Sequence, residues 1–335
     1  MAINIAINGF GRIGRAAFKN IIDYYPELKV VAINDLSDKK NIALLLQSDS
    51  CYGRYHRIVS SDEQGIIVDK KRYPVFAEKE PELLPWKKLK VDIVLECTGR
   101  FNSEKGANLH LIAGAKKVIL SAPAKEGKVK TIVLGVNESK LKKTDHIISN
   151  ASCTTNCLAP VMAVLKEKIG VKKAIMTTIH SYTADQNLVD GAHKDPRRAR
   201  AAAVNIIPTT TGAAISVTET IPSLVGKFDG IAVRVPTPVV SLCDIVFIAS
   251  KKTSIEVINK AFENAAETKQ GLLDASKEDL VSTDIIGDSH SAIIDLKNTK
   301  VVDGDLVKVI AWYDNEWAYA CRLVDLAFLT TKFIK

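Results

Sequence analysis

The chain lacks any long apolar segment and any export-type beginning. Its longest apolar runs, such as Ile3 to Ile7 and Ile245 to Ala249, have the length of a strand, whereas a membrane-spanning helix needs about 20 apolar residues. The first run follows the first two residues without the basic region, hydrophobic core or cleavage site of a secretory signal. These absences predict a cytoplasmic protein without a membrane-embedded part.

Cysteine is also scarce, with six cysteines in 335 residues. Thinly spread cysteines without an export signal argue against a disulfide framework. Cys153 and Cys157 stand four positions apart, but no second Cys or His pair has zinc-finger spacing. We therefore predict no metal site, and the remaining question is whether one of the cysteines is reactive.

Low-complexity tracts and Gly/Ser-rich or Pro-rich linkers are missing as well. With 47% hydrophobic and 25% charged residues, the composition is that of a globular protein, and the length favours two domains. The net charge of +8 fits an anionic ligand, nucleic acid, an acidic surface or simply a lysine-rich solvated surface. Because no RNA-binding or zinc-finger signature accompanies it, nucleic acid is retained only as a secondary partner, not a required one.

Strand-like and helical segments alternate from the beginning of the chain. A strand at Ile3 to Ile7, a helix from about Arg12 to Tyr24 and a strand at Lys29 to Ile33 form a βαβ unit, which implies a parallel sheet. Further buried-strand candidates lie at residues 92–96, 117–120, 131–134 and 146–149. Residues 1–151 are therefore predicted to form an α/β domain with a Rossmann-type, doubly wound parallel sheet.

The pattern changes after residue 151. Longer β runs follow at residues 173–180, 230–235, 242–249 and 307–312, together with a helix at about 254–267. They predict a second, α+β domain with a mixed sheet over residues 152–316. Apolar residues at helical spacing then predict a C-terminal helix within residues 317–335, which could dock on either domain.

The segment Asn8 to Gly14 places G-x-G-x-x-G directly after a strand and at the start of a helix. In this motif Gly9 makes the tight turn, Gly11 lets the backbone approach a pyrophosphate, and Gly14 lets the helix pack on the sheet. Taken alone, the motif could be a glycine-rich turn without a ligand. The second strand, however, ends at Asp35, where a carboxylate accepts from ribose hydroxyls and repels a 2′-phosphate, so NAD is favoured over NADP.

Cys153 stands at the predicted start of a helix that runs to about Lys168. The helix dipole is expected to lower the thiol pKa there and favour the thiolate. The alternative is that Ser152 or Thr154 merely caps the helix while Cys153 packs inside. His180 follows another strand and could face the cysteine, and a Cys–His pair is the usual arrangement of an activated thiol.

Six segments together resemble the phosphorylating, NAD-dependent glyceraldehyde-3-phosphate dehydrogenase family. The resemblance covers essentially the whole chain and is carried by residues 8–14, 149–160 (Ser-Asn-Ala-Ser-Cys-Thr-Thr-Asn-Cys-Leu-Ala-Pro), 180–183, 208–214, 234–238 and 312–316. It implies that Cys153 attacks the aldehyde, that the thiohemiacetal loses hydride to NAD and becomes a thioester, and that inorganic phosphate releases 1,3-bisphosphoglycerate. His180 would raise the thiolate population, take the hydroxyl proton and steady the oxyanion.

The resemblance also implies two anion sites. Thr183 and Arg234 would bind the substrate phosphate, where an arginine fork suits phosphate oxygens. The attacking phosphate would be bound by Ser152, Thr154, Arg198, Thr211 and Gly212. The implied cofactor contacts are Gly9, Gly11, Arg12, Ile13, Gly14, Asp35, Lys79, Ser121 and Asn315. Asn315 would bond the nicotinamide carboxamide, and Lys79 stands where many members carry Arg.

Further properties follow from the resemblance alone. It implies a homotetramer working in glycolysis and gluconeogenesis, with the C-terminal helix returning to the first domain. The basic stretch at residues 193–200 resembles the family's loop near the cofactor and the subunit interface, with Arg197 and Arg200 in structural roles. Gly191 and Ala192 stand where strictly NAD-dependent members often carry Leu-Pro, so we expect NAD preference with some tolerance of NADP.

Two alternatives are weaker. Erythrose-4-phosphate dehydrogenase, a sister family, generally departs from the Thr-Gly and Pro-Thr-Pro motifs, and this chain keeps both at residues 211–212 and 236–238. A basic relative that has lost catalysis and serves as an RNA-binding or surface-adhesion module is disfavoured because every catalytic position is filled. A salt-sensitive affinity for nucleic acid would be the sign of such a binding role.

Overall fold

The computed structural model describes residues 2–334 and divides the chain into two compact units. Unit 1 contains the residues up to Ile132, Ser139–Ala151 and the residues from Ala320 onward. Unit 2 contains Val133–Glu138 and Ser152–Tyr319. Residues 133–138 therefore group with the second unit, whereas the sequence placed them in the first domain.

Unit 1 is built on a sheet in the order β10-β11-β9-β8-β1-β2-β7-β6-β5. Its strands are β1 (Ile3–Asn8), β2 (Leu28–Asn34), β5 (Val59–Ser61), β6 (Gly65–Val68), β7 (Lys71–Phe76), β8 (Ile93–Glu96), β9 (Lys117–Leu120), β10 (Lys130–Thr131) and β11 (Ile147–Ser149). The strands from β10 to β7 pair in parallel, which confirms the Rossmann-type α/β prediction. The antiparallel ribbon β5–β6–β7 at one edge was not predicted.

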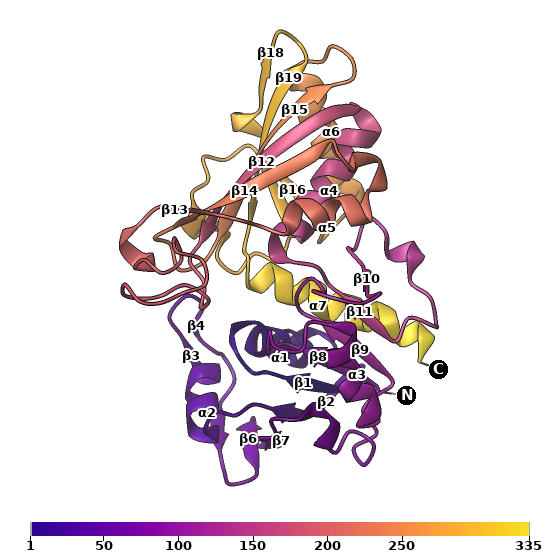
Figure 1. The fold of residues 1–335 in the computed structure, drawn as a ribbon, viewed down its shortest axis with the longest axis vertical. Coiled ribbons are helices and arrows are strands. Elements are labelled where there is room, and N and C mark those ends of the chain that lie inside the picture. The colour runs from indigo at the N-terminus through magenta and orange to yellow at the C-terminus, as the bar shows by residue number, and fades with distance from the viewer. Residues whose placement is uncertain (1, 335) are drawn as a thin grey trace. The chain divides into compact units, whose positions relative to one another are not determined.

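Helices follow several of the sheet strands of unit 1 along the chain (Figure 1). They are α1 (Arg12–Tyr24), α2 (Lys39–Gln47) and α3 (Glu104–Ile112), with a short hairpin of β3 (Ser48–Asp49) and β4 (Gly53–Arg54) and a 3-10 turn η1 (Pro81–Leu83). The bounds of α1 are those predicted from the sequence. Its apolar face is anchored by Phe18, whose ring lies edge-on to Phe10 at 5.5 Å and to Tyr73 at 4.9 Å.

The strand predicted at residues 131–134 is wrong. β10 ends at Thr131, and the backbone then turns, because Asn137 Oδ1 accepts from Val133 N at 2.8 Å and Asn137 N donates to Val133 O at 3.1 Å. Ile132 and Val133 are fully buried. A buried turn and a short buried strand give the same apolar run in a sequence, which explains the error.

Unit 2 is built on a mixed sheet in the order β13-β14-β12-β15-β19-β17-β16, with β18 pairing to β19. The strands are β12 (Val171–Ser181), β13 (Ile207–Thr209), β14 (Phe228–Val235), β15 (Ser241–Ala249), β16 (Leu273–Ser276), β17 (Ala292–Asp295), β18 (Lys300–Val302) and β19 (Leu306–Tyr313). β12 pairs in parallel with β14 and antiparallel with β15, so the predicted mixed sheet is confirmed.

Helices α4 (Cys153–Lys168), α5 (Ala213–Thr220) and α6 (Ile255–Thr268) gather on one side of this sheet (Figure 1). Buried and half-buried residues alternate along β15, as expected for a sheet with one covered face. Unit 2 also contains the short 3-10 turns η3 (Ala202–Val204), η4 (Pro222–Leu224), η5 (Ser282–Ile285) and η6 (Leu296–Asn298). Two further 3-10 turns are η2 (Glu138–Lys140), at a boundary between the units in the chain, and η7 (Thr331–Phe333), in unit 1.

The last helix, α7 (Trp317–Thr330), joins unit 1 from Ala320 onward. Asn20 Nδ2 of α1 donates to Cys321 Sγ at 3.2 Å, and the Tyr25 hydroxyl donates to Asp325 Oδ1. The Tyr25 ring also lies 5.5 Å from the ring of Phe328. The C-terminal helix therefore packs beside the helix that follows the glycine motif.

Residues 2–334 contain neither a membrane-spanning helix nor a group of side chains arranged to hold a metal ion. None of the described helices is both long and apolar enough to cross a membrane. In the same part of the chain, no group of three or more His, Cys, Asp or Glu residues is arranged to hold a metal ion.

The packing of Gly14 gives a stability prediction. A Cβ added at Gly14 would lie 2.2 Å from Gly9 O, whereas one added at Gly11 would meet nothing within 4 Å. We expect Gly14→Ala to lower the free energy of unfolding by about 1 to 3 kcal/mol, as overpacking does. Gly11→Ala is the matched control and should stay within about 0.5 kcal/mol of wild type. Urea unfolding without cofactor measures both, and equal midpoints for the two variants would contradict the packing argument.

Candidate active site

Unit 1 contains a pocket of about 290 Å³ at the carboxyl ends of β1, β2 and β8. Ligands of open α/β sheets bind at this edge, where the strand order reverses. The pocket is lined by Asn8, Gly9, Gly11, Asn34, Asp35, Leu36, Glu78, Lys79, Cys97, Thr98, Arg100 and Phe101. Of the predicted cofactor residues, Gly9, Gly11, Asp35 and Lys79 line this pocket.

The glycine turn is tied to the end of β2 through Asp35. Its Oδ2 accepts from Phe10 N at 2.7 Å, and its Oδ1 accepts from Ser37 N at 2.9 Å. Gly9 has φ of 88°, and a Cβ there would lie 2.6 Å from Thr98 N, so only glycine fits. The carboxylate therefore holds the turn in place and faces the pocket as an acceptor.

The other predicted cofactor residues of unit 1 are not among those lining the pocket. Arg12 Nη1 pairs with Asp49 Oδ2 at 2.7 Å, and its guanidinium lies 5.5 Å from the ring centre of Tyr52. Ile13 is half-buried in the first turn of α1, beside the buried Gly14. Ser121 follows β9, and its N–H donates to Glu96 O at 3.0 Å.

A buried polar cluster beneath the glycine turn was missed by sequence reasoning. Glu96 Oε2 accepts from Asn8 Nδ2 at 2.6 Å and lies 3.0 Å from His110 Nε2. Trp86 Nε1 lies 3.0 Å from His110 Nδ1. Because an indole N–H can only donate, Nδ1 accepts, and Nε2 carries the hydrogen that Glu96 receives. The cluster joins the ends of β1 and β8, and its members are too far apart in sequence to form a motif.

The cysteine and histidine singled out in the sequence meet in unit 2. Cys153 opens α4 and His180 lies near the end of β12, with 3.5 Å between Cys153 Sγ and His180 Nε2. His180 Nδ1 donates to the carbonyl of Ser181 at 2.7 Å, because a carbonyl oxygen can only accept. Nε2 of the neutral ring is therefore an acceptor that faces the thiol. Ser152 caps α4 through Thr155 N at 3.1 Å, so the capping role and the Cys–His pair coexist.

Burial makes both members of this pair favour their neutral forms. It raises the pKa of Cys153 even though the Thr154 hydrogen bond and the charge of Arg234 act in the opposite direction. Burial, aided by the charge of Arg234, lowers the pKa of His180 to about 3. The prediction that the helix dipole gives Cys153 a lowered pKa is therefore wrong, because desolvation outweighs the stabilising contacts.

Arg234 stands directly beside His180 in the parallel register of β12 and β14. Its Nη1 donates to Thr183 Oγ1 at 2.7 Å and to Ser181 O at 3.2 Å. Its Nε is buried without a hydrogen-bond partner. An unmatched buried donor on a cation costs free energy and indicates a place for an anion.

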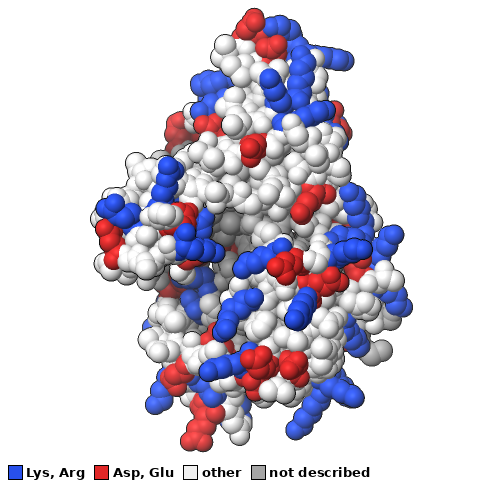
Figure 2. Space-filling view, viewed as in Figure 1, with Lys and Arg blue, Asp and Glu red and all other residues white. Residues whose placement is uncertain are grey.

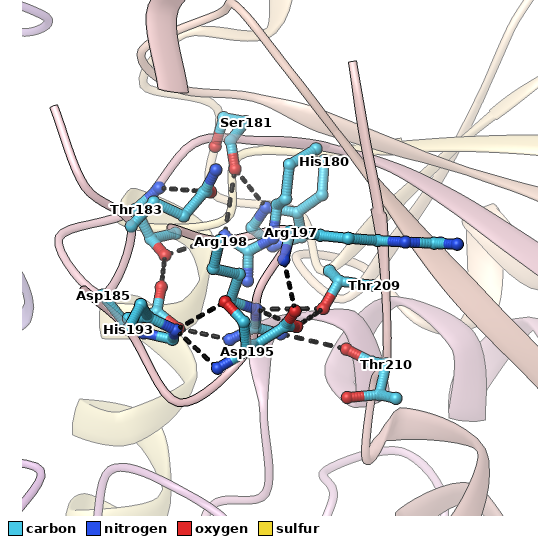
Figure 3. Close-up of polar contacts among 12 residues, drawn as sticks. His180, Ser181, Thr183, Asp185, His193, Asp195, Arg197, Arg198, Thr209 and Thr210 are labelled. Carbon is cyan, nitrogen blue, oxygen red and sulfur yellow. Dashed lines mark hydrogen bonds and ion pairs between the residues drawn. The ribbon is translucent and has the colours of Figure 1, made fainter. Parts of the chain in front are cut away.

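Arg198 lies in the long loop after β12 and is held on several sides (Figure 3). Its Nε donates to Thr209 Oγ1 at 3.0 Å, its Nη2 donates to Thr210 O at 3.1 Å, and its Nη1 pairs with Asp185. The two threonines lead into Thr211, whose Oγ1 accepts from Ala213 N at 3.2 Å, and into Gly212, which caps α5. The arginine is thus joined to the segment that carries Thr211 and Gly212, two of the other four predicted ligands of the attacking phosphate.

Tyr313 holds the segment that carries Cys153 in position. This role of Tyr313 was not predicted from the sequence. Its hydroxyl lies 2.9 Å from Thr154 Oγ1 and 2.9 Å from Thr178 Oγ1, and its ring centre is 6.1 Å from that of His180. Because Thr154 lies on α4 and Thr178 on β12, Tyr313 at the end of β19 fixes these three elements around the Cys–His pair.

Asn315 lies two residues after Tyr313, just beyond the end of β19. Its Oδ1 accepts from Ser181 Oγ and from Ser241 Oγ, each at 3.0 Å. The two hydroxyls orient the amide, so its Nδ2 group is left to donate to a carbonyl. This arrangement is suited to the predicted bond with the nicotinamide carboxamide.

Arginines of the basic stretch at residues 193–200 bond to acceptors in the loop after β12 and in β13. Arg200 Nε bonds Asp190 Oδ2 at 2.9 Å, and Arg197 Nη1 donates to Pro208 O at 3.2 Å. Figure 2 shows Lys and Arg scattered over the visible face and interspersed with Asp and Glu. The visible face therefore fits a solvated, mixed-charge surface better than a continuous polyanion-binding stripe.

Comparison with known proteins gives full-length matches. The family profile described as "Glyceraldehyde 3-phosphate dehydrogenase, NAD binding domain" matches residues 3–104, and the one described as "Glyceraldehyde 3-phosphate dehydrogenase, C-terminal domain" matches residues 152–315. Glyceraldehyde-3-phosphate dehydrogenase of Geobacillus stearothermophilus is 52% identical over 329 residues, covering 98% of both chains. Its counterparts are 49% identical in Zymomonas mobilis subsp. mobilis, covering 98% of both chains, and 52% identical in Bacillus subtilis (glyceraldehyde-3-phosphate dehydrogenase 1), covering 99% of both.

The Cys–His pair predicts an unusual pH profile for the alkylation of Cys153. Between the pKa of His180, about 3, and the raised pKa of the thiol, the pair holds one shared proton, so the ratio of its neutral and ion-pair forms does not change with pH. The rate with iodoacetamide should therefore be flat in this range, rise above the thiol pKa as the last proton leaves, and fall below the pKa of His180.

His180→Asn removes the proton acceptor and should convert the plateau into a rate that rises about tenfold per pH unit below the thiol pKa. Peptide mass analysis follows Cys153 separately from the other two half-buried cysteines, Cys51 and Cys97. Superimposable profiles for wild type and His180→Asn would show that the imidazole does not share the thiol proton.

Proposed function

Because this chain belongs to the glyceraldehyde-3-phosphate dehydrogenase family, we propose that it oxidises D-glyceraldehyde 3-phosphate to 1,3-bisphosphoglycerate with NAD and inorganic phosphate, in glycolysis and gluconeogenesis. The observation that carries the proposal is the Cys153–His180 contact of 3.5 Å beside Arg234. The proposed nucleophile Cys153, its base His180 and the cation Arg234, which can bind a phosphate group, thus lie next to one another.

In this mechanism Cys153 Sγ attacks the aldehyde carbon, and its proton passes to His180 Nε2. The imidazolium stabilises the oxyanion and protonates it to the hydroxyl of a thiohemiacetal. His180 would then take the hydroxyl proton of the thiohemiacetal. NAD, when bound, would supply the two-electron acceptor for the hydride. The thioester that results is attacked by a phosphate oxygen, and Cys153 departs as the thiolate.

The two anion sites are assigned as the family resemblance implies. We propose that Arg234 and Thr183 bind the substrate phosphate, which is supported by the unpartnered Nε of Arg234. The attacking phosphate would be bound by Ser152, Thr154, Arg198, Thr211 and Gly212. Arg198 reaches the segment before Thr211 through Thr209 and Thr210, which supports grouping them in one site.

For the cofactor we propose that unit 1 holds the dinucleotide and unit 2 carries out the chemistry, with the boundary near residue 151 and the C-terminal helix serving the first unit. The residues fit NAD: Gly9 and Gly11 leave the pocket edge open, and α1 begins without a side-chain cap, as a phosphate-binding helix does. Arg12, Ile13, Gly14, Asp35, Lys79, Ser121 and Asn315 complete the proposed contacts. Gly191 and Ala192 are exposed small residues, which supports some tolerance of NADP.

We also propose a homotetramer in the cytoplasm. The sheet of unit 2 exposes Ile175 (61%), Ile231 (51%) and Leu306 (40%), and the loop after β12 exposes Leu188 and Val189 above 70%. Clusters of exposed apolar side chains mark surfaces that bind other chains. A second copy of this chain is the occupant that the family resemblance implies.

The reaction is tested by NADH formation at 340 nm with glyceraldehyde 3-phosphate, with and without inorganic phosphate. Turnover should require phosphate and should fall by at least about 10³-fold in Cys153→Ser, because the hydroxyl is a far weaker nucleophile than the thiolate. Turnover without phosphate in the wild type, or full activity in the variant, would refute the acceptor or the nucleophile.

The cofactor preference depends on the charge of Asp35. Asp35→Asn keeps an oxygen to accept from Phe10 N and removes the charge that repels a 2′-phosphate. We expect kcat/KM with NADP to rise at least about tenfold relative to that with NAD, a change of about 1.4 kcal/mol. Equal catalytic efficiency of the wild-type enzyme with both cofactors would defeat the proposed preference.

A further inference from the structure

One carboxylate, Asp185, joins residues that were assigned to different anion sites. Thr183 Oγ1 donates to Asp185 Oδ1, and Arg198 Nη1 bonds Asp185 Oδ2. Figure 3 shows Asp185 between these two side chains. Because each contact uses a different oxygen, the single side chain bridges the proposed substrate-phosphate ligand Thr183 and the proposed inorganic-phosphate ligand Arg198.

These bonds occupy the groups that a phosphate would need. The Thr183 oxygen accepts from Arg234 Nη1 at 2.7 Å, and its one hydrogen is given to Asp185. A hydroxyl has a single hydrogen, so Thr183 cannot donate to a phosphate oxygen while Asp185 holds it. Arg198 gives one N–H of Nη1 to Asp185, while its Nε and Nη2 each donate to a threonine oxygen.

A carboxylate offers arginine and threonine the same kind of charged acceptor oxygen that phosphate does. The surroundings keep Asp185 in this anionic form. Burial by itself would raise its pKa, but the Thr183 hydrogen bond and the charges of Arg198 and Arg234 lower the pKa overall. Asp185 is therefore a negative charge of the chain itself, in contact with ligands of both proposed anion sites.

We propose that Asp185 is a positioning residue that competes with phosphate: its carboxylate holds the Thr183 hydroxyl and one N–H of Arg198 Nη1, and phosphate anions must displace it to take these two donors. The identity of the two anions rests on the proposed function, whereas the competition itself does not. An anion that pairs with Arg198 displaces the carboxylate and frees the Thr183 hydroxyl to donate to the second anion. Displacement of the shared carboxylate thus couples the two sites, because the anion that pairs with Arg198 makes the Thr183 hydroxyl available to the second anion.

Asp195 provides a matched control on the same arginine. Its Oδ2 lies 3.5 Å from Arg198 Nε and accepts from Thr209 Oγ1 at 2.6 Å, and its Oδ1 accepts from Arg197 N at 2.9 Å. It is thus placed beside Arg198 but, unlike Asp185, does not receive the Thr183 hydroxyl. Asp195→Asn therefore removes a negative charge next to Arg198 and leaves the bridge to Thr183 intact.

The test compares wild type, Asp185→Asn, Asp185→Glu and Asp195→Asn. The first measurement is the inorganic phosphate concentration at which half of the protein binds phosphate, obtained by fitting the rise of thermal stability with phosphate concentration, without aldehyde or NAD. Asp185→Asn should lower this concentration about five- to tenfold, since one nearby like charge is lost. Asp185→Glu keeps the charge and should retain the wild-type value.

The second measurement is the KM of each substrate in the NADH assay. Asp185→Asn should lower the KM for phosphate and the KM for glyceraldehyde 3-phosphate, whereas Asp195→Asn should lower only the former. If half-saturation in Asp185→Asn is unchanged or raised while NADH still forms, Asp185 only supports Arg198 and the inference is overturned. Tighter phosphate binding in Asp185→Glu, or the same pair of KM changes in Asp195→Asn, also overturns it. Absence of turnover in every form, with the phosphate shifts as expected, refutes the proposed function alone.

Discussion

The contact between Cys153 Sγ and His180 Nε2 depends on a carbonyl that takes no part in the chemistry. Ser181 O accepts from His180 Nδ1 at 2.7 Å and so leaves Nε2 as the acceptor that faces the thiol. Tyr313 fixes the start of α4 against β12 and β19, which keeps the pair in reach. Since burial raises the pKa of the thiol and lowers that of the imidazole, we expect the thiolate to form by transfer of a proton within the pair. Such a transfer leaves the net charge of the buried site unchanged, so it avoids the cost of burying a single ion.

Many of the helices and strands that position these residues could be predicted from the sequence, because each depends on a motif or an apolar pattern within a short segment. The glycine motif predicted the start of α1, and apolar runs predicted five of the nine strands of the first sheet and four of the eight of the second. The buried cluster of Glu96, His110 and Trp86 could not be predicted, since its members meet only after the chain has crossed the sheet. The resemblance predicts Arg198 as a phosphate ligand. Asp185, in contrast, is one acidic residue in a polar loop, and no spacing distinguishes it from its neighbours.

The carboxylates of Glu96 and Asp35 both lie near the glycine turn of unit 1, but they have different structural roles. Glu96 is fully buried and is surrounded by donors from Asn8, Thr98 and His110, so its lone pairs are used within the protein. Asp35 uses its oxygens on two backbone N–H groups and still lines the pocket. The first therefore fixes the strand ends, and the second fixes the turn while facing a ligand.

The two arginines of unit 2 differ in how their charges are balanced. Arg198 has Asp185 and Asp195 within ion-pair distance, whereas Arg234, judged over residues 2–334, forms no ion pair with a carboxylate and has a buried, unpartnered Nε. An uncompensated buried cation gains most from an anion that stays in place, as the phosphate of a covalently held substrate does. A compensated cation binds an anion more weakly and releases it more readily. In the proposed function, this unequal pairing would suit Arg234 to the phosphate that remains on the thioester and Arg198 to the phosphate that arrives and leaves with the acyl group.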